Sequence, residues 1–414
     1  MKELIEIGNR ARQASSQLAH LNTEQKNRIL LLVADMLEES IPSILEANTA
    51  DLKQGEAMGL KGAIVDRLAL SDKRIHDISQ GLREIVQLED PVGEIGEMKK
   101  RPNGLMIGKK RVPLGVVGVI YESRPNVTAD VAGLCIKTGN VCVLRGGKEA
   151  FFSNNAIVKI FHEAIVKCGL DPHMVQLVQD TTRASAMAMM KLNEYLDILI
   201  PRGGAGLIQA VVQNSTVPVI ETGVGNCHIY VDEAADLDKA VAIVHNAKTH
   251  RPGVCNAAES LLVHKNVAAQ VLPAIGTSLQ GAGVEIRGDR WTCELIPDAL
   301  SASEEDWATE YLDLVISSKV VDSVEEAVDH INRYGSMHSE SIVTENYSHA
   351  QYFLDRVDAA AVYVNASTRF TDGFEFGYGA EIGISTQKLH ARGPMGLKEL
   401  TTNKYIIYGS GQIR

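Results

Sequence analysis

Cys255 has the sequence surroundings of a reactive cysteine. It follows the turn residues Pro252 and Gly253 and stands shortly before the apolar run 261–263. This order predicts a thiol at an accessible bend that is backed by a rigid strand. A thiolate at such a bend could attack a carbonyl carbon and hold the acyl group as a thioester. The alternative is a small buried apolar residue, which is a common role of cysteine.

Three other residues could assist this chemistry. His250 and Arg251 closely precede Cys255 and could lower the pKa of its thiol or bind a departing phosphate group. Both could equally be surface residues of the turn. Glu221 lies in a glycine-rich segment and could bring a carboxylate near the thiol, or it could be a solvated loop acid.

Asn126 is a candidate for stabilising an oxyanion. It follows the apolar run 114–121, which is typical of a strand in a parallel sheet covered on both faces. Open sheets of this kind bind ligands at the carboxyl ends of their strands, where Asn126 would offer a neutral amide donor. Alternatively, Asn126 caps a helix that begins near Thr128.

Two glycine-rich turns could bind a nucleotide, although the chain contains neither a GxGxxG fingerprint nor a P-loop. The turns at 145–148 and 202–206 each follow an apolar run, and glycines there let a pyrophosphate or ribose approach the backbone. Both could also be ordinary strand-to-helix turns. A basic pair in the first turn suits the extra phosphate of NADP, whereas Glu149 suits the ribose hydroxyls of NAD. The candidate contacts are Arg145, Lys148, Gly203, Gly204 and Gly206.

Length and composition limit the class of protein. The 414 residues are too many for one ordinary core, so two domains are expected. A net charge of −11 argues against general nucleic-acid binding, which needs a basic face. No apolar run is long enough for a bilayer and the N-terminus lacks a signal-like apolar region, so the cytoplasm is the expected location. The six cysteines form no CxxC pair or zinc-like cluster, and no metal site is predicted.

Hydrophobic patterns predict the elements that must position these residues. Apolar residues recur at helical spacing through the first ninety positions. A basic hairpin is expected at 91–112, because an Asn-Gly pair lies between two extended pieces. It could be a solvated arm or could pair with another subunit. From 112 onward strands and helices alternate as in a doubly wound sheet, a second α/β stretch runs from about 229 to 384, and 404–408 is expected to form a last strand.

Together these segments resemble the aldehyde dehydrogenase superfamily over nearly the whole chain. The resemblance implies an α/β fold of the aldehyde dehydrogenase type, with a Rossmann-like cofactor domain, an α/β catalytic domain and a small β module for oligomerisation. The strings that carry it lie at 124–128, 144–150, 221–228, 249–260, 330–340, 365–370 and 390–396.

The resemblance also implies domain boundaries. The cofactor-binding domain would comprise 1–92, 112–228 and 385–400, and the catalytic domain 229–384. The hairpin at 93–111 and the strand at 401–414 would form the oligomerisation module, so a homo-oligomer is expected.

Carried over residue by residue, the resemblance implies a complete catalytic set. Cys255 matches the nucleophile, while Asn126 and the backbone N–H of Cys255 match the two oxyanion donors. Glu221 stands where hydrolysing members keep the base that activates water. Glu310 matches a residue that holds the nicotinamide ribose.

Within the superfamily, the chain looks like the branch that reduces L-glutamyl 5-phosphate with NADPH, giving L-glutamate 5-semialdehyde and phosphate. This reaction would be the second step from glutamate to proline. The lysine that the superfamily keeps near the adenosine ribose appears as Arg145, or as Lys148 in a shifted register. The candidates for the substrate's phosphate and carboxylate groups are Arg124, Arg251, Arg369 and Arg392.

Two alternative functions stay open on the sequence. One is a hydrolysing aldehyde dehydrogenase, in which Glu221 activates water on the thioester. The other is a catalytically silent relative that serves as a binding or scaffold protein, for instance as a partner of glutamate kinase. A transient contact with glutamate kinase is also a hypothesis for the active enzyme.

Overall fold

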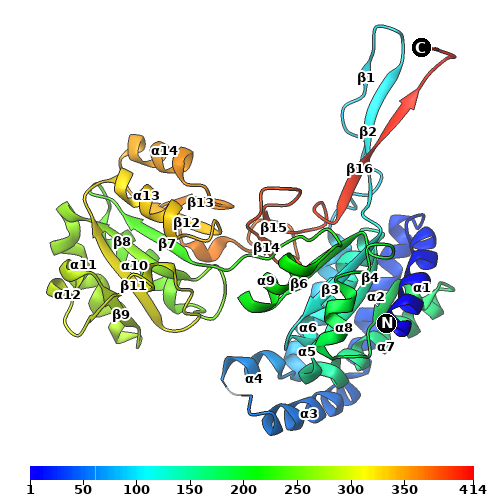
Figure 1. The fold of residues 1–414 in the computed structure, drawn as a ribbon, viewed down its shortest axis with the longest axis horizontal. Helices are drawn as coiled ribbons and strands as arrows, with labels where there is room; N and C mark the ends of the chain where they lie inside the picture. Colours follow the sequence, from blue (N-terminus) through cyan, green and yellow to red (C-terminus); the bar gives the residue numbers. More distant parts are fainter. Residues whose placement is uncertain (61) are drawn as a thin grey trace. The chain divides into compact units, whose positions relative to one another are not determined.

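The computed structural model describes residues 1–60 and 62–414, which divide into two compact units (Figure 1). Unit 1 comprises Met1–Thr222, Gly377–Gly383 and Met395–Arg414, and unit 2 comprises Gly223–Phe376 and Ile384–Pro394. The units therefore divide after residue 222, whereas the sequence placed the boundary after 228. The difference has a local cause, because Gly225 and Cys227 contact the backbone of Cys255 in unit 2.

Unit 1 begins with the predicted helices. These are α1 (Lys2–Leu18), α2 (Thr23–Glu39), α3 (Ile41–Ala57), α4 (Ala63–Leu68) and α5 (Asp72–Gln87). Each long helix buries one apolar stripe, as residues spaced three and four apart along a helix share a face. Asn22 and Gln25 form a reciprocal capping box that fixes the start of α2.

A four-stranded parallel sheet forms the centre of unit 1, in the order β5-β4-β3-β6. Its strands and the helices between them are β3 (Val116–Tyr121), α6 (Pro125–Lys137), β4 (Val141–Gly146), α7 (Phe151–Lys167), β5 (Val175–Leu177), α8 (Arg183–Met189), β6 (Ile198–Arg202) and α9 (Ala205–Asn214). The chain moves from β3 outward to β5 and then returns to the other side of β3. The carboxyl ends of β3 and β6 are therefore a switch point, where open α/β sheets bind ligands.

Unit 2 contains a seven-stranded parallel sheet in the order β10-β9-β11-β8-β7-β12-β13. Its elements are β7 (Cys227–Val231), α10 (Leu237–Thr249), β8 (Ala258–His264), α11 (Lys265–Gly281), β9 (Glu285–Gly288), α12 (Arg290–Leu295), β10 (Leu300–Ser301), β11 (Val315–Val321), α13 (Val324–Tyr334), β12 (Ser339–Val343), α14 (Tyr347–Arg356) and β13 (Ala361–Val364). The two parallel sheets confirm the predicted α/β class.

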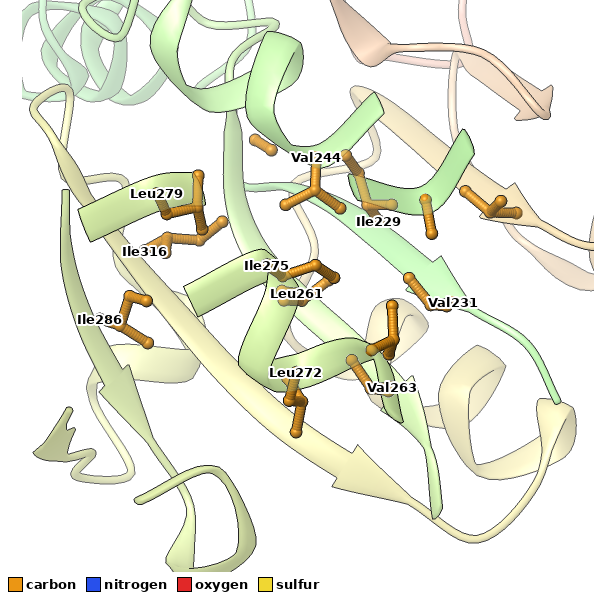
Figure 2. Packing of buried hydrophobic residues seen from close by; sticks show 14 of the residues in the cluster. Ile229, Val231, Val244, Leu261, Val263, Leu272, Ile275, Leu279, Ile286 and Ile316 are labelled. Atoms are coloured by element: carbon orange, nitrogen blue, oxygen red, sulfur yellow. The ribbon is translucent and has the colours of Figure 1, made fainter. Parts of the chain in front are cut away.

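Alternation along the strands of unit 2 builds a core on each face of the sheet. Figure 2 shows one core, in which strand residues such as Ile229 and Leu261 meet Val244 of α10 and Ile275 of α11. The neighbouring strand residues point to the other face and pack with α13 and α14. That second core includes Tyr230, Leu262, Ile331, Ile342 and Phe353.

A three-stranded antiparallel sheet completes unit 1. It joins β1 (Lys99–Lys100), β2 (Met106–Pro113) and β16 (Thr401–Tyr408) in the order β1-β2-β16 (Figure 1). The predicted hairpin and last strand are thus paired with each other. Tyr405, Ile407 and Tyr408 of β16 are exposed. Two short strands, β14 (Ile384–Ser385) and β15 (Gly393–Pro394), pair within unit 2.

None of the helices in the described part of the chain combines the length and the apolar composition that crossing a membrane requires.

A buried ion pair joins the two elements that flank the Cys255 turn. Lys248, in the last turn of α10, places Nζ 2.6 Å from Oε2 of Glu259, the second residue of β8, and both side chains are fully buried. The backbone N–H of Leu312 donates to the other carboxylate oxygen at 3.2 Å. Burial lowers the pKa of Lys248 and raises that of Glu259. The pair therefore fixes the separation of the two ends of the loop.

Glu259→Gln is expected to lower the free energy of unfolding by about 3 kcal/mol or more, because it leaves the Lys248 ammonium buried without its counter-charge. The double variant Lys248→Met/Glu259→Gln should recover most of this loss. Glu345→Gln is the matched control, because the ion pair between Glu345 and Lys239 is half exposed. Exposed pairs contribute at most about 1 kcal/mol to the free energy of unfolding. Urea unfolding measures all three variants. Equal losses for Glu259→Gln and Glu345→Gln would contradict the assignment.

Candidate active site

Cys255 lies in the turn between α10 and β8, partly exposed, as the sequence predicted. Its carbonyl oxygen accepts a hydrogen bond from the thiol of Cys227 at 3.1 Å. A methyl group added at Gly225 would lie 1.6 Å from the same oxygen, so only glycine fits there. Burial raises the pKa of Cys227, which keeps this thiol protonated and able to donate. The backbone of Cys255 is thus clamped from the side of β7.

Glu310 supports this clamp. Its Oε1 accepts a hydrogen bond from the backbone N–H of Gly225 at 2.7 Å. Glu310 and the Cys255 carbonyl therefore both contact Gly225. The resemblance assigns the carboxylate of Glu310 to the nicotinamide ribose. The ribose contact itself stays a prediction.

Two of the four candidate arginines lie together beside Cys255. Arg251 is exposed in the same turn, and Arg369 belongs to the 3₁₀ turn Thr368–Phe370. Asn256, which follows Cys255, donates from Nδ2 to the carbonyl oxygen of Arg369 at 3.4 Å. Burial lowers the pKa of Arg369, and the positive charge of Arg251 lowers it further. The region next to the thiol is therefore cationic.

Arg392 differs from these two residues because a carboxylate already neutralises it. Its Nη2 lies 2.7 Å from Oδ1 of Asp358, and Lys388 binds the other oxygen of the same aspartate at 2.5 Å. The sequence could not show this, as the partner residue lies thirty-four positions away. Binding of substrate by Arg392 would require this ion pair to open.

Asn126 lies within the first turn of α6, which begins at Pro125 with Arg124 as its N-cap residue. The alternative interpretation of Asn126 as a helix cap is therefore wrong, because the helix starts before it. Its Nδ2 donates to Oδ2 of Asp130, one turn along the helix, at 3.0 Å. The second N–H of this amide is directed away from that bond and could serve an oxyanion. Burial raises the pKa of Asp130 to about 6, against the opposing effects of Asn126 and Arg202.

The two basic residues of the first glycine turn have different environments. Arg145 is buried, and its Nη2 donates to the carbonyl oxygens of Thr181 and Thr182 at 2.5 and 2.8 Å. Lys148 is exposed at the start of a 3₁₀ turn. Glu149 accepts hydrogen bonds from the backbone N–H and hydroxyl of Ser123 at 2.6 and 2.8 Å. Lys148 is thus the accessible cation of this turn, whereas Arg145 ties the end of β4 to Thr181 and Thr182; a ribose-phosphate contact stays a prediction.

The second glycine turn contains an acid that the sequence analysis missed. Glu122, directly after β3, accepts a hydrogen bond from the backbone N–H of Gly204 at 3.1 Å, at the N-terminus of α9. A methyl group at Gly203 would lie 2.4 Å from this carboxylate, whereas Gly204 and Gly206 face open space. The turn is therefore open over Gly204 and Gly206, while the Glu122 carboxylate occupies the N–H donor of Gly204; binding of a pyrophosphate there stays a prediction. The sequence did offer a signal for Glu122, because it directly follows a predicted parallel strand, where such sheets bind ligands.

Glu221 is partly buried near the end of unit 1. The next residue, Thr222, donates from its hydroxyl to the carbonyl oxygen of Pro201 at 2.8 Å, which ties this segment to β6. A water-activating role for Glu221 stays a prediction.

Asp130→Asn is expected to flatten the dependence of stability on pH. The pKa of an unfolded aspartate is about 3.9, so between that value and about 6 the native state holds a proton that the unfolded state releases. Lowering the pH from 7 to 4 should therefore stabilise the wild type by about 1–2 kcal/mol more than the variant. This magnitude includes a reduction for the partial exposure of the Asp130 side chain. Urea unfolding at several pH values measures this difference. Parallel pH curves for the two proteins would contradict it.

Comparisons with known proteins show the family to which the chain belongs. Residues 2–286 match the model of the aldehyde dehydrogenase family. The chain is 60% identical to the gamma-glutamyl phosphate reductase of Caldicellulosiruptor bescii over 418 residues, with 100% of both chains covered. It is 61% identical to the reductase of the same name from Moorella thermoacetica over 407 residues, with 98% of this chain and 97% of that protein covered.

Solved structures extend the comparison. The crystal structure of gamma-glutamyl phosphate reductase from Thermotoga maritima covers 100% of both chains at 52% identity, with a TM-score of 0.97. An acetylating aldehyde dehydrogenase from Geobacillus thermoglucosidasius shares the fold at 18% identity and a TM-score of 0.72, with 100% of this chain and 98% of that chain covered. The resemblance and the fold predicted from the sequence are thereby confirmed. The chain belongs to the aldehyde dehydrogenase family of oxidoreductases and falls among its members named gamma-glutamyl phosphate reductase.

Proposed function

We propose that this enzyme reduces L-glutamyl 5-phosphate with NADPH to L-glutamate 5-semialdehyde and phosphate, as the second step from glutamate to proline. The observation that carries the chemistry is the clamped turn of Cys255 beside the cationic pair Arg251 and Arg369. The substrate class comes from relatives about 60% identical over the full chain, whose name is gamma-glutamyl phosphate reductase.

The proposed reaction begins with attack of the Cys255 thiolate on the acyl carbon of the acyl phosphate. The backbone N–H of Cys255 and the amide of Asn126 donate to the oxyanion that forms on the carbonyl oxygen. The bond from that carbon to the phosphate oxygen then breaks, inorganic phosphate leaves, and a thioester remains on Cys255. The clamp at Gly225 and Cys227 acts on the Cys255 carbonyl, and so fixes the peptide unit that follows the residue carrying the thiol.

The residues of unit 1 would hold NADPH, which when bound supplies the hydride that reduces the thioester carbon. Lys148 would bind the ribose phosphate, and the turn formed by Gly203, Gly204 and Gly206 would accept the pyrophosphate at the N-terminus of α9. Glu310 would contact the nicotinamide ribose. After reduction, the sulfur–carbon bond breaks to give the aldehyde, and the Cys255 thiolate is regenerated.

A homo-oligomer built through the three-stranded sheet is part of the proposal. The sheet exposes Tyr405, Ile407 and Tyr408 on β16, and aromatic and aliphatic side chains of this kind are enriched in protein interfaces. A transient contact with glutamate kinase stays a hypothesis.

Cys255→Ala is expected to abolish NADPH oxidation with L-glutamyl 5-phosphate, because no thioester can form. Binding of NADPH should persist, since the proposed cofactor residues lie on other elements. Steady-state turnover and NADPH titration by fluorescence measure the two properties. Cys293→Ala is the control at another thiol and should retain turnover, because Cys293 lies on α12 and its thiol contacts the carbonyl oxygens of Gly288 and Leu300. Substantial reduction of the acyl phosphate by Cys255→Ala would exclude this mechanism.

Oxidation of L-glutamate 5-semialdehyde with NADP⁺ should require inorganic phosphate, because phosphate must release the acyl group from Cys255. A hydrolysing dehydrogenase, with Glu221 activating water, would instead turn over without phosphate. Measuring NADPH formation with and without phosphate separates the two functions. A rate that does not depend on phosphate would favour the hydrolytic alternative, and the absence of any rate would favour a silent scaffold.

A further inference from the structure

Two arginines beside Cys255 form no ion pair with a carboxylate of the described residues. Within residues 1–60 and 62–414, neither Arg251 nor Arg369 takes part in an ion pair, although Arg392 and most other buried or half-buried basic side chains of unit 2 do. The Nε of Arg369 is buried and makes no hydrogen bond. A buried guanidinium N–H without an acceptor is costly, and a ligand oxygen is an acceptor that would satisfy it.

The position of Arg369 is fixed by the residue that follows the nucleophile. Asn256 donates from Nδ2 to the carbonyl oxygens of Arg369 and Thr371, at 3.4 and 2.9 Å. The hydroxyl of Thr368 donates back to the carbonyl oxygen of Asn256 at 2.7 Å. Three hydrogen bonds thus hold the turn that carries Arg369 against the turn that carries Cys255. These bonds run from the side chains of Asn256 and Thr368 to backbone oxygens, so they do not depend on the long arginine side chain.

The charge of this pair matches a dianion. Arg251 and Arg369 repel each other, which adds to the effect of burial in lowering the pKa of Arg369. Asp372 is the acid whose negative charge acts on Arg369. Among the described residues, these two side chains form no ion pair. A carboxylate carries one negative charge, whereas a phosphoryl group carries up to two and offers oxygens to both guanidinium groups.

The distance of each anionic group of the substrate from the attacked carbon also favours the phosphate. In a glutamyl phosphate, the phosphate oxygen is bonded directly to the carbonyl carbon that Cys255 attacks. The α-carboxyl carbon is four carbon–carbon bonds away, which is about 5 Å in an extended chain. A cation fixed next to the nucleophile therefore faces the phosphoryl group when the carbonyl carbon is in position for attack.

We propose that Arg251 and Arg369 form the phosphoryl subsite, which binds the leaving phosphate of the substrate and inorganic phosphate in the reverse reaction. The α-carboxylate then binds elsewhere, with Arg124 as the sequence candidate. This inference rests on the proposed function. As the carbon–oxygen bond breaks, the electron pair passes to the phosphate oxygen, and the two guanidinium groups neutralise the charge that develops there.

The reverse reaction tests this assignment, because phosphate and L-glutamate 5-semialdehyde are then separate substrates with separate KM values. Arg369→Gln should raise the KM for inorganic phosphate roughly 30-fold or more, as for truncation of other buried charge partners. Arg251→Gln should raise it too, and because this side chain is exposed, the variant tests the subsite without disturbing the core. The KM for the semialdehyde should stay nearly unchanged in both.

Arg290→Gln is the matched control, since Arg290 is exposed on α12 and pairs only with Glu294 on the same helix. Both KM values should stay at the wild-type level in this variant. A rise in the semialdehyde KM with an unchanged phosphate KM would overturn the proposal in favour of a carboxylate site. Unchanged values for both substrates would overturn it as well. Lack of phosphate-dependent turnover in the wild type would instead contradict the proposed function itself.

Discussion

The site depends on the fixed position of the Cys255 carbonyl. That oxygen lies against Gly225 and accepts a hydrogen bond from the buried thiol of Cys227. The ion pair between Lys248 and Glu259 joins the two ends of the loop that carries it. Holding this carbonyl fixes the peptide unit that follows Cys255 and limits the movement of the residue that carries the thiol. The buried charges on both sides of the loop provide this rigidity, which a surface turn of the same sequence would lack.

The two units present their functional residues from opposite ends of their strands. In unit 1, Glu122, Asn126 and Lys148 follow strands, at the carboxyl edge where parallel sheets bind ligands. In unit 2, Cys227 and Cys255 lie at the amino ends of β7 and β8. The usual rule for open sheets therefore explains the place of the proposed cofactor site but not that of the proposed nucleophile. A loop closed by a buried ion pair takes over the positioning that strand ends provide in unit 1.

Local sequence patterns predicted the elements well, because apolar periodicity and turn residues act over a few positions. The bend at Cys255 follows from Pro252 and Gly253, and the hairpin follows from Asn103 and Gly104. The hydrogen bond between Asn126 and Asp130 could also be predicted from the sequence, because residues four apart share a helix face. Pairings across elements were not, since nothing in the spacing joins Lys248 to Glu259 or Arg392 to Asp358. Such partners are chosen by the tertiary fold.

The two neighbouring thiols show how environment separates similar groups. Cys227 is fully buried, the nearby charge of Glu340 adds to the effect of burial in raising its pKa, and its proton is used in a hydrogen bond. Cys255 instead stands in the turn next to Arg251 and Arg369, whose positive charges favour a thiolate. The same arginines would hold the phosphate that leaves. In the described part of a chain with a net charge of −11, two cations without an ion-pair partner therefore lie beside Cys255, where the proposed reaction has an anion attack and an anion leave.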